Sequence, residues 1–465
     1  MKTSYRLRLL LLALVAALAL APAMNAAKAQ EKVKILWFVG IGSGTNEQQI
    51  AAEKEVVADF NASQDKIELE INIAPTFETA TDTLSTLIAA GTPPDIVGPV
   101  GVGGSNQYAD QWVDLKPFVE KAKYDLSGLD PALLDLYATA NGGYSAIPFG
   151  VFPSVVYYSR DLFDEAGLKY PPQAFGDQYE MPDGTKVDWN YDTLATIAKM
   201  LTVDANGKTP ADAAFDATQI KQFGLTQGYE RIRLLWTQLS PAEFYNAETK
   251  KVNAPEGWEK GLQWWYDRVW VDHSMPTDSY AQSELFGSGN PFNSGNVAMV
   301  ISPLWYTCCI NDSIGKFEWD MAVVPQSFDG QYHVAMDADT FRMTKDSKHP
   351  DEAFTVLTYL LNDAVPKLAP TYGAFPALTK YQQPWIDSKA AQYNWNVKWQ
   401  VAIDSLSKVI PANMHHESNL PNWSKVYDRE FALQTMLLGE TGKDMDVKAE
   451  FAKFIADVQA ITEEK

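Results

Sequence analysis

The sequence predicts an α/β protein with a largely parallel sheet. From residue 33 onwards, short β-rich segments alternate with amphipathic helical segments. An order of strand, helix, strand, helix, strand requires crossover connections that place consecutive strands side by side in one parallel sheet. The chain has 465 residues, of which 46% are hydrophobic, so it is long enough for two or three domains or one large two-lobed unit.

The first five segments establish the alternation of strands and helices. In order, we expect a buried strand at 33–39, a helix at 46–60, a half-buried strand at 66–73, a helix at 81–90 and a short strand at 95–97. In the first helix, Ile50, Val57 and Phe60 share one face. The second helix ends where Gly91 and two prolines follow it.

The later segments are predicted from the same signals. In order, we expect a strand at 154–159, a short helix ending at Gly167, an insert with hairpin-like turns at 171–189, a helix at 191–201 and an amphipathic helix from 447 to 461. The residues Trp258, Leu262, Trp265 and Val269 recur at helical spacing. This stripe is typical of the core-facing side of a helix.

Residues 1–29 are predicted to be a secretory signal peptide. Lys2, Arg6 and Arg8 precede the apolar run 9–21, and Ala27 and Ala29 stand where a signal peptidase reads small residues. Thirteen apolar residues are too few to cross a bilayer as a helix, which disfavours a membrane anchor. We therefore expect an exported protein, periplasmic or extracellular, that is soluble after cleavage at Gln30.

The charge of the chain excludes several partners. Removal of the signal peptide takes away four basic and no acidic residues, so the formal net charge falls from −21 to −25. So acidic a protein is not expected to bind nucleic acid or an anionic membrane surface. The two cysteines, Cys308 and Cys309, are adjacent. In an oxidising compartment they are either a strained vicinal disulfide or two buried thiols, and they do not form a metal site alone.

The glycines after the first strand raise the question of nucleotide binding. Gly40 and Gly42 fit the start of a dinucleotide fingerprint, but Thr45 stands in place of the third glycine and Gly44 comes one residue early. We therefore reject a nucleotide cofactor and expect no cofactor at all. Glycines at the carboxyl end of a strand still let a ligand approach the backbone beside a helix N-terminus.

Other motifs are interpreted as structural. Gly207-Lys208-Thr209 lacks the earlier glycine of a phosphate loop, and the turn that starts at Asp204 has Lys208 and Pro210 where calcium ligands belong. We read this segment as a surface turn and expect no metal. The residues His415, His416 and Glu417 are assigned to the surface by default. No strong catalytic signature is present, so we expect a protein that is not an enzyme.

Four stretches together resemble a known family. They are AGTPPDIV (90–97), IPFGVFPSVVYYSRDLFDEAGLKYPP (147–172), NSGNVAMVISPLW (293–305) and YGAFPAL (372–378). With the signal peptide, they are similar to the family 1 extracellular solute-binding proteins, the substrate-capture components of ABC importers that include maltose-binding-type proteins. The resemblance covers essentially the whole mature chain in the expected order.

The resemblance implies a periplasmic-binding-protein fold of two α/β lobes, each a mostly parallel sheet flanked by helices, joined by a multi-segment hinge. We place lobe one at residues 30–151 and 326–371, and lobe two at residues 152–325 and 372–465. The ligand then binds in the cleft between the lobes and is buried by hinge closure. The resemblance also implies membrane permease subunits as partners, and we expect the protein itself to be a monomer.

The resemblance and the order of strands together suggest the ligand contacts. Trp305 resembles the stacking tryptophan of the family, and Phe152 falls at a ligand-contact position of the first crossing. The remaining candidates are Gly42, Ser43, Gly44, Thr45, Glu78, Asp337, Asp339, Tyr372 and Trp423. A rigid Cys308–Cys309 ring would shape the cleft wall beside Trp305.

The resemblance also implies a carbohydrate ligand, mono- or oligosaccharide. Aromatic rings would cover the apolar face of such a sugar, and planar polar groups would bind its hydroxyls. Two alternatives stay open. One is a secreted glycan-active hydrolase, whose two carboxylates only the fold would bring together. The other is a binding protein for a polyamine or peptide, for which Asp337, Asp339 and Glu78 would supply negative charge.

Overall fold

The computed structural model describes residues 31–464, except residues 140, 229–231, 311–312, 417 and 419. It gives no side-chain description for residues 77, 78, 102, 103 and 308. The predicted signal peptide lies outside the described residues. Within the described ranges, no helix combines the length and the apolar composition that a membrane span requires.

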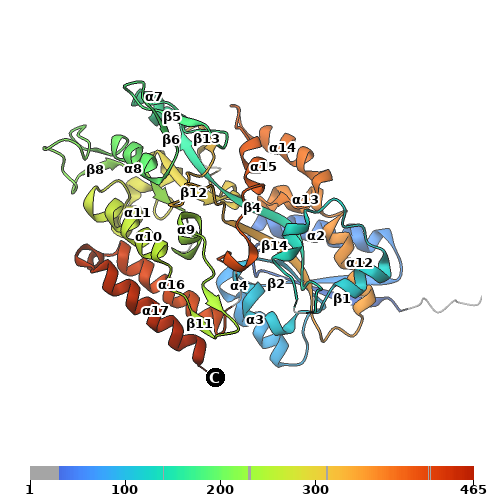
Figure 1. Cartoon of the computed structure of the whole chain (residues 1–465). Coiled ribbons are helices and arrows are strands. Elements are labelled where there is room, and N and C mark those ends of the chain that lie inside the picture. Colours follow the sequence, from blue (N-terminus) through green and yellow to red (C-terminus); the bar gives the residue numbers. More distant parts are fainter. Residues whose placement is uncertain are drawn as a thin grey trace, which may run out of the picture.

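Strands and helices alternate in the first part of the described chain, and the part after β15 contains helices only (Figure 1). Up to residue 200 the elements are β1 (Val33–Val39), α2 (Glu47–Ser63), β2 (Ile67–Ile73), α3 (Phe77–Ala89), β3 (Ile96–Val100), α4 (Val102–Gln107), α5 (Lys116–Ala122), α6 (Pro131–Asp135), β4 (Ile147–Ser159), α7 (Arg160–Glu165), β5 (Gln178–Glu180), β6 (Lys186–Asp188) and α8 (Tyr191–Met200). From there to residue 322 they are β7 (Val203–Asp204), β8 (Ile220–Gln222), β9 (Thr226–Gln227), α9 (Ile232–Leu239), β10 (Tyr245–Asn246), β11 (Lys251–Val252), α10 (Glu256–Tyr266), α11 (Asp278–Ala281), β12 (Met299–Pro303), the short helix η5 (Leu304–Cys308) and β13 (Trp319–Ala322). The remaining ones are β14 (Met336–Met343), α12 (Pro350–Leu361), α13 (Val365–Tyr372), β15 (Phe375–Pro376), α14 (Gln382–Ala390), α15 (Gln400–Leu406), α16 (Trp423–Leu438) and α17 (Val447–Glu463).

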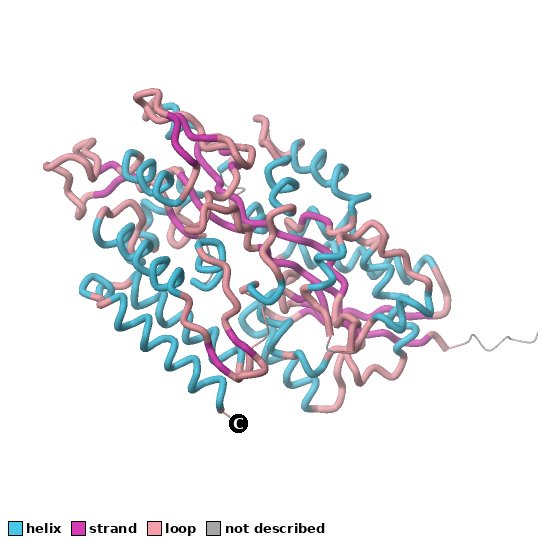
Figure 2. The backbone as a smooth tube through the Cα atoms, viewed as in Figure 1, coloured by secondary structure: helices cyan, strands magenta, loops and turns pink. Residues whose placement is uncertain are grey.

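The α/β fold class predicted from the alternation is confirmed. β1 pairs in parallel with β2 and with β3, as the βαβ order requires, and β9 pairs in parallel with β12. The long strands β4 and β14 run antiparallel to their neighbours. Helices cover the sheet on both faces (Figure 2), which is why strands such as β3 and β4 are apolar and buried along their length.

Strand β4 is shared by the two halves of the molecule. Its first half pairs with β14 on one edge and with β15 on the other, whereas its second half pairs with β12 and β13. Figure 1 shows β4 running from the β14 side of the molecule to the β12 side. By strand pairing, the chain first crosses between lobes within β4, and β15 still belongs to the lobe-one half.

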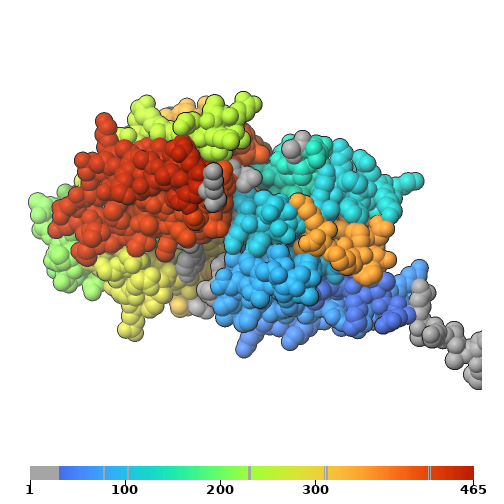
Figure 3. Space-filling view, turned by 90° about the horizontal axis from the view of Figure 1, so that it is seen from below, coloured from blue at the N-terminus to red at the C-terminus, as the bar shows by residue number. Residues whose placement is uncertain are grey.

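Two further segments accompany β4 at this crossing. The Ser154 N–H donates to the Ala335 carbonyl, so the segment before β14 lies against β4. Val334 in turn bonds to the segment after α15, with its N–H on the Lys408 carbonyl and its carbonyl on the Ile410 N–H. Three adjacent segments thus connect the lobes, as the predicted multi-segment hinge requires. The face in Figure 3 divides accordingly into a body with the N-terminal residues and α12 and a body that carries α16 and α17.

The core of lobe two is built around tryptophan. Trp236 on α9 stacks on Trp258 of α10, with ring centroids 5.2 Å apart, and its edge contacts Phe451 and Phe454 of α17. The stripe predicted from Trp258 to Val269 is confirmed as buried. The last helix, predicted from its apolar spacing, closes this core from outside.

The predicted face of the helix α2 is wrong in its details. The buried residues are Gln49, Glu53, Val56 and Phe60, whereas Ile50 and Val57 are only partly buried. The buried face of α2 differs from the predicted one because two polar side chains, those of Gln49 and Glu53, are buried. Gln49 completes a capping box with Asn46, and Glu53 bonds to a tyrosine of α13.

Candidate ligand-binding site

The loop after β1 is held tightly by protein contacts. Gly44 has a φ of +107°, and a Cβ there would lie 2.0 Å from Val39 Cγ1 and 2.5 Å from Glu53 Oε1. A Cβ at Gly42 would lie 2.8 Å from the Gly101 nitrogen. Both positions therefore need glycine because the loop packs against its own strand, helix and the neighbouring β3–α4 turn. The N–H of Gly44 is bonded to Gln49 Oε1 at 2.8 Å.

Ser43 and Asp339, both predicted site residues, meet across the sheet. The Ser43 hydroxyl donates to Asp339 Oδ2 over 3.3 Å, which ties the β1–α2 loop to β14. Asp339 is buried. Burial and the nearby charge of Asp337 raise the pKa of its carboxyl group to about 7, against the opposing effect of the Ser43 hydrogen bond.

Tyr372 lies behind this loop. Its ring is buried, and its hydroxyl donates to Glu53 Oε1 at 2.8 Å. Burial raises the pKa of Glu53 to about 7, with the Tyr372 hydrogen bond opposing, and it raises the pKa of the Tyr372 phenol well above its usual value. The structure therefore places Tyr372 in the support of the loop, and a direct ligand contact stays a prediction.

The buried Glu53 makes the stability of the protein depend on pH. The folded state holds its proton up to about pH 7, whereas the unfolded chain loses it near 4.5. The contribution of Glu53 to the free energy of unfolding is therefore fully present below pH 4.5 and is lost between about 4.5 and 7. Glu53→Gln has no carboxyl group to titrate and so avoids this loss. In urea unfolding experiments, the free energy of unfolding of the variant should rise relative to that of the wild type by about 3 kcal/mol between pH 4.5 and pH 8. A difference between the two proteins that stays constant with pH would contradict this.

Trp305 and Asp337 form the second group of predicted residues that the structure brings together. Trp305 lies in η5, directly after β12, and its ring is partly exposed. Its indole N–H donates to Asp337 Oδ2 over 2.7 Å. Phe152 on β4 stands directly opposite Asp337 in the β4–β14 register and is buried. Phe152 therefore packs beside this pair at the crossing of the lobes.

The surface assignment of His415 and His416 is wrong. Both side chains are buried, because the segment before α16 runs along the start of β14. The His416 ring bonds to Asp337 Oδ1 through Nε2 at 2.5 Å, and His415 Nε2 donates to the Met336 carbonyl. Burial, with His416 beside it, holds the pKa of His415 well below its usual value, so His415 is neutral.

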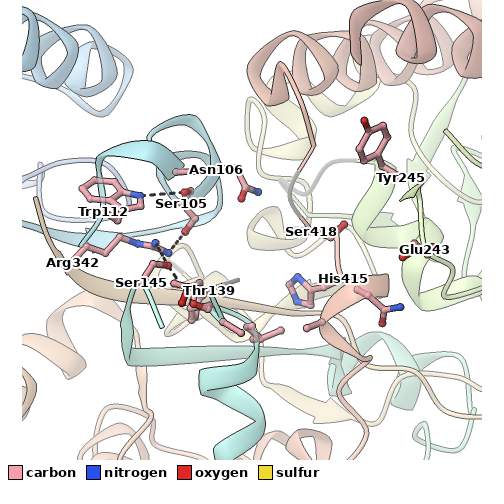
Figure 4. Close-up of a pocket in the computed structure, with 16 residues that line it drawn as sticks. Ser105, Asn106, Trp112, Thr139, Ser145, Glu243, Tyr245, Arg342, His415 and Ser418 are labelled. Carbon is pink, nitrogen blue, oxygen red and sulfur yellow. Dashed lines mark hydrogen bonds between the residues drawn. The ribbon is translucent and has the colours of Figure 1, made fainter. Parts of the chain in front are cut away.

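A cavity of about 510 Å³ opens beside His415 between the two lobes. Figure 4 shows Ser105 and Asn106 of α4 on one side, and Glu243, Tyr245 and Ser418 on the other. Helices α4 and α16 are in contact, so the lobes meet next to this cavity. A volume of this size is in the range of small-molecule sites, and such sites commonly lie between domains.

The lobe-one wall of the cavity is ordered by Arg342. Its guanidinium donates to the hydroxyls of Ser105 and Ser145, at 2.8 Å and 3.1 Å. It lies between the rings of Trp112 and Tyr137, 5.5 Å and 5.0 Å from their centroids. These contacts hold the serines and the aromatic rings in place, so the wall is pre-formed.

The structure also gives the positions in the fold of the remaining predicted ligand contacts. Trp423 begins α16, is buried, and stacks on Tyr427 with ring centroids 4.8 Å apart. Thr45 is partly buried at the end of the first loop. Glu78 lies in α3 and Cys308 in η5, but the side chains of both lie outside the described residues. Their assigned roles, including the Cys308–Cys309 bridge, stay predictions.

The turn at Asp204 is explained without a metal. Asp204 Oδ1 accepts the N–H groups of Asn206 and Lys208, and Oδ2 accepts the N–H of Asp216. Its carboxylate thus closes the turn, as the surface-turn interpretation requires. Among the described residues, no group of three or more histidine, cysteine, aspartate or glutamate side chains could hold a metal ion.

Comparison with known proteins places the chain in a family. Residues 44–365 match the model of the bacterial extracellular solute-binding proteins, and the chain belongs to that family. A binding protein of Brucella abortus (strain 2308) is 22% identical over 411 residues, which are 86% of this chain and 88% of the relative.

Two solved structures show the same two-lobed fold. One is an ABC substrate-binding protein from Listeria monocytogenes in complex with cycloalternan, with a TM-score of 0.70, 20% identity, and 94% of this chain and 100% of that chain covered. The other is a sugar-binding protein from Xanthomonas citri, with a TM-score of 0.69, 16% identity, and 92% and 97% covered. Membership of this family identifies a solute-binding protein and not an enzyme.

Proposed function

We propose that this protein is the substrate-binding component of an ABC importer and that it captures a carbohydrate between its lobes. Family membership supports the importer role, and the two structures of similar fold are described as an ABC substrate-binding protein with cycloalternan and as a sugar-binding protein. Export by the predicted signal peptide and recognition by membrane permease subunits belong to the same proposal.

The observation that carries the proposal is the chemistry of the interlobe cavity. Its lining combines aromatic rings with hydroxyl, amide and carboxylate groups that come from both lobes, namely Trp112, Tyr137, Thr139, Glu243, Tyr245 and Asn413. Sugar hydroxyls donate to and accept from such groups, while the apolar face of a sugar ring packs on aromatic rings. The guanidinium of Arg342, within this lining, is engaged with serine hydroxyls. Neutral polyols therefore suit the cavity better than phosphate esters.

The hinge supplies the mechanism of capture. A ligand that contacts both walls favours the conformation in which the walls are close, and it shifts the lobes toward that state by its differential affinity. The segments that cross between the lobes lie next to Phe152, Asp337 and His416. Closure therefore acts on the residues that hold Trp305.

A thermal-shift screen of the purified protein tests the function. A neutral mono- or oligosaccharide that binds should add about 2.7 kcal/mol to the free energy of unfolding at 100 times its dissociation constant. Glycerol phosphate and spermidine serve as anionic and cationic probes and should give no shift. A shift with spermidine and none with any sugar would overturn the carbohydrate assignment, and product release from an oligosaccharide would identify a hydrolase.

A further inference from the structure

The carboxylate of Asp337 joins three segments that are far apart in the sequence. Its Oδ2 accepts the indole N–H of Trp305, which follows β12 in lobe two, and its Oδ1 is bonded to Nε2 of His416, on the segment before α16. The distances are 2.7 Å and 2.5 Å. Asp337 itself lies at the start of β14, next to the hinge.

The chemistry of the three groups fixes the direction of both hydrogen bonds. An indole nitrogen only donates, and carboxylate oxygens accept, so both oxygens of Asp337 are occupied by N–H groups. His416 must carry its hydrogen on Nε2 to donate to Oδ1. Its Nδ1 is buried and has no hydrogen-bond partner among the described residues, so the Asp337 bond is the one that orients the ring.

The histidine is also held by its neighbour. The rings of His415 and His416 lie 4.3 Å apart at an angle of 30°, and His415 is anchored to the carbonyl of Met336. The His416 ring is thus packed on one side and bonded to Asp337 through one nitrogen. Such a ring prevents the carboxylate from turning, and a fixed carboxylate gives the indole N–H one direction in which to point.

We propose that His416 is a positioning residue, which acts through Asp337 to fix the plane of the Trp305 ring that stacks on the carbohydrate. This inference rests on the proposed function. A hydrogen bond to a charged group that fixes a binding residue in advance reduces the cost of ordering it when the ligand arrives.

The affinity test is a double-mutant cycle on the full-length mature protein, with the best sugar of the thermal-shift screen as the probe. His416→Ala should weaken binding by about tenfold, whereas His416→Gln, which keeps an N–H donor, should recover most of the affinity. In the background of Trp305→Phe, which lacks the indole N–H, His416→Ala should change the affinity by less than about twofold. A tenfold loss of affinity from His416→Ala in the Trp305→Phe background would overturn the proposal.

A matched control is available on the surface. His333 bonds through Nε2 to Asp329 at 2.9 Å, and Asp329 is exposed. His333→Ala removes the same type of pair and should leave the affinity unchanged. A comparable loss from His333→Ala would show that the effect of His416→Ala is not specific to the Trp305 relay and would overturn the proposal.

A spectroscopic test does not depend on the ligand. In the tryptophan side-chain ¹⁵N spectrum, the Trp305 indole signal, assigned by its absence from Trp305→Phe, should shift and exchange faster with solvent in His416→Ala and stay in place in His416→Gln. An unchanged indole signal in His416→Ala would overturn the positioning role, even if no sugar binds. Failure of every sugar to bind with a displaced indole signal would instead overturn the proposed function alone.

Discussion

Glu430→Ala is expected to lower the free energy of unfolding by about 3–5 kcal/mol. Glu430 on α16 and Arg233 on α9 form an ion pair with 2.9 Å between Oε1 and Nε, and their side chains are only 1% and 3% exposed. Removal of the carboxylate leaves a guanidinium buried in the core of lobe two. Water has little access to its charge there, so the cost is that of a buried cation that has lost this carboxylate partner.

Urea unfolding measured by circular dichroism checks this result. The double variant Arg233→Met/Glu430→Leu should recover most of the loss, because apolar side chains of similar size need no ionic partner. Lys260→Ala, which breaks the exposed pair with Glu256, serves as the control and should cost less than about 1 kcal/mol. A loss from Glu430→Ala as small as that control would show that the buried pair is not a major source of stability.

Trp305→Ala is expected to weaken carbohydrate binding by at least about 30-fold, or roughly 2 kcal/mol. The ring is partly exposed and its indole N–H donates to Asp337, so the alanine variant removes the proposed stacking surface and leaves most of the core intact. Trp305→Phe keeps an aromatic face but loses the bond to Asp337, and should fall between the alanine variant and the wild type. Isothermal titration calorimetry measures the affinities.

Trp395 provides the matched comparison for this prediction. It is also partly buried, and its indole N–H donates to the Trp319 carbonyl at 2.8 Å, within an aromatic cluster of lobe two. Trp395→Ala should therefore lower the melting temperature and leave the affinity unchanged, the reverse of Trp305→Ala. If Trp305→Ala destabilised the protein and bound sugar normally, Trp305 would be a core residue and not a stacking platform.

The order of elements was largely predictable because local pattern determines it. Apolar runs and alternation located β1, β2 and the second half of β4, and helical spacing located the stripe from Trp258 and the last helix. The face of α2 was predicted wrongly, because Gln49 and Glu53 are buried by partners elsewhere in the chain. A hydrophobic pattern cannot indicate polar residues whose burial depends on a tertiary hydrogen bond.

The candidate site was predicted in part. Sequence and resemblance together named Ser43, Trp305, Asp337 and Asp339 one by one as ligand contacts. They did not predict the bonds that the structure shows between Ser43 and Asp339 and between Trp305 and Asp337. His416 was missed because adjacent histidines usually lie at the surface, and nothing near it in the sequence indicated a carboxylate 79 residues earlier. The cavity residues Ser105 and Arg342 were missed for the same reason, since their bond joins positions 237 residues apart.

The contacts of Trp236 have a consequence for the order in which the chain folds. Its ring needs Phe451 and Phe454, which are synthesised more than 200 residues later. Contacts between such distant residues carry a large entropy of loop closure and form late. Lobe two therefore cannot complete its core until α17, at the end of the chain, has left the ribosome.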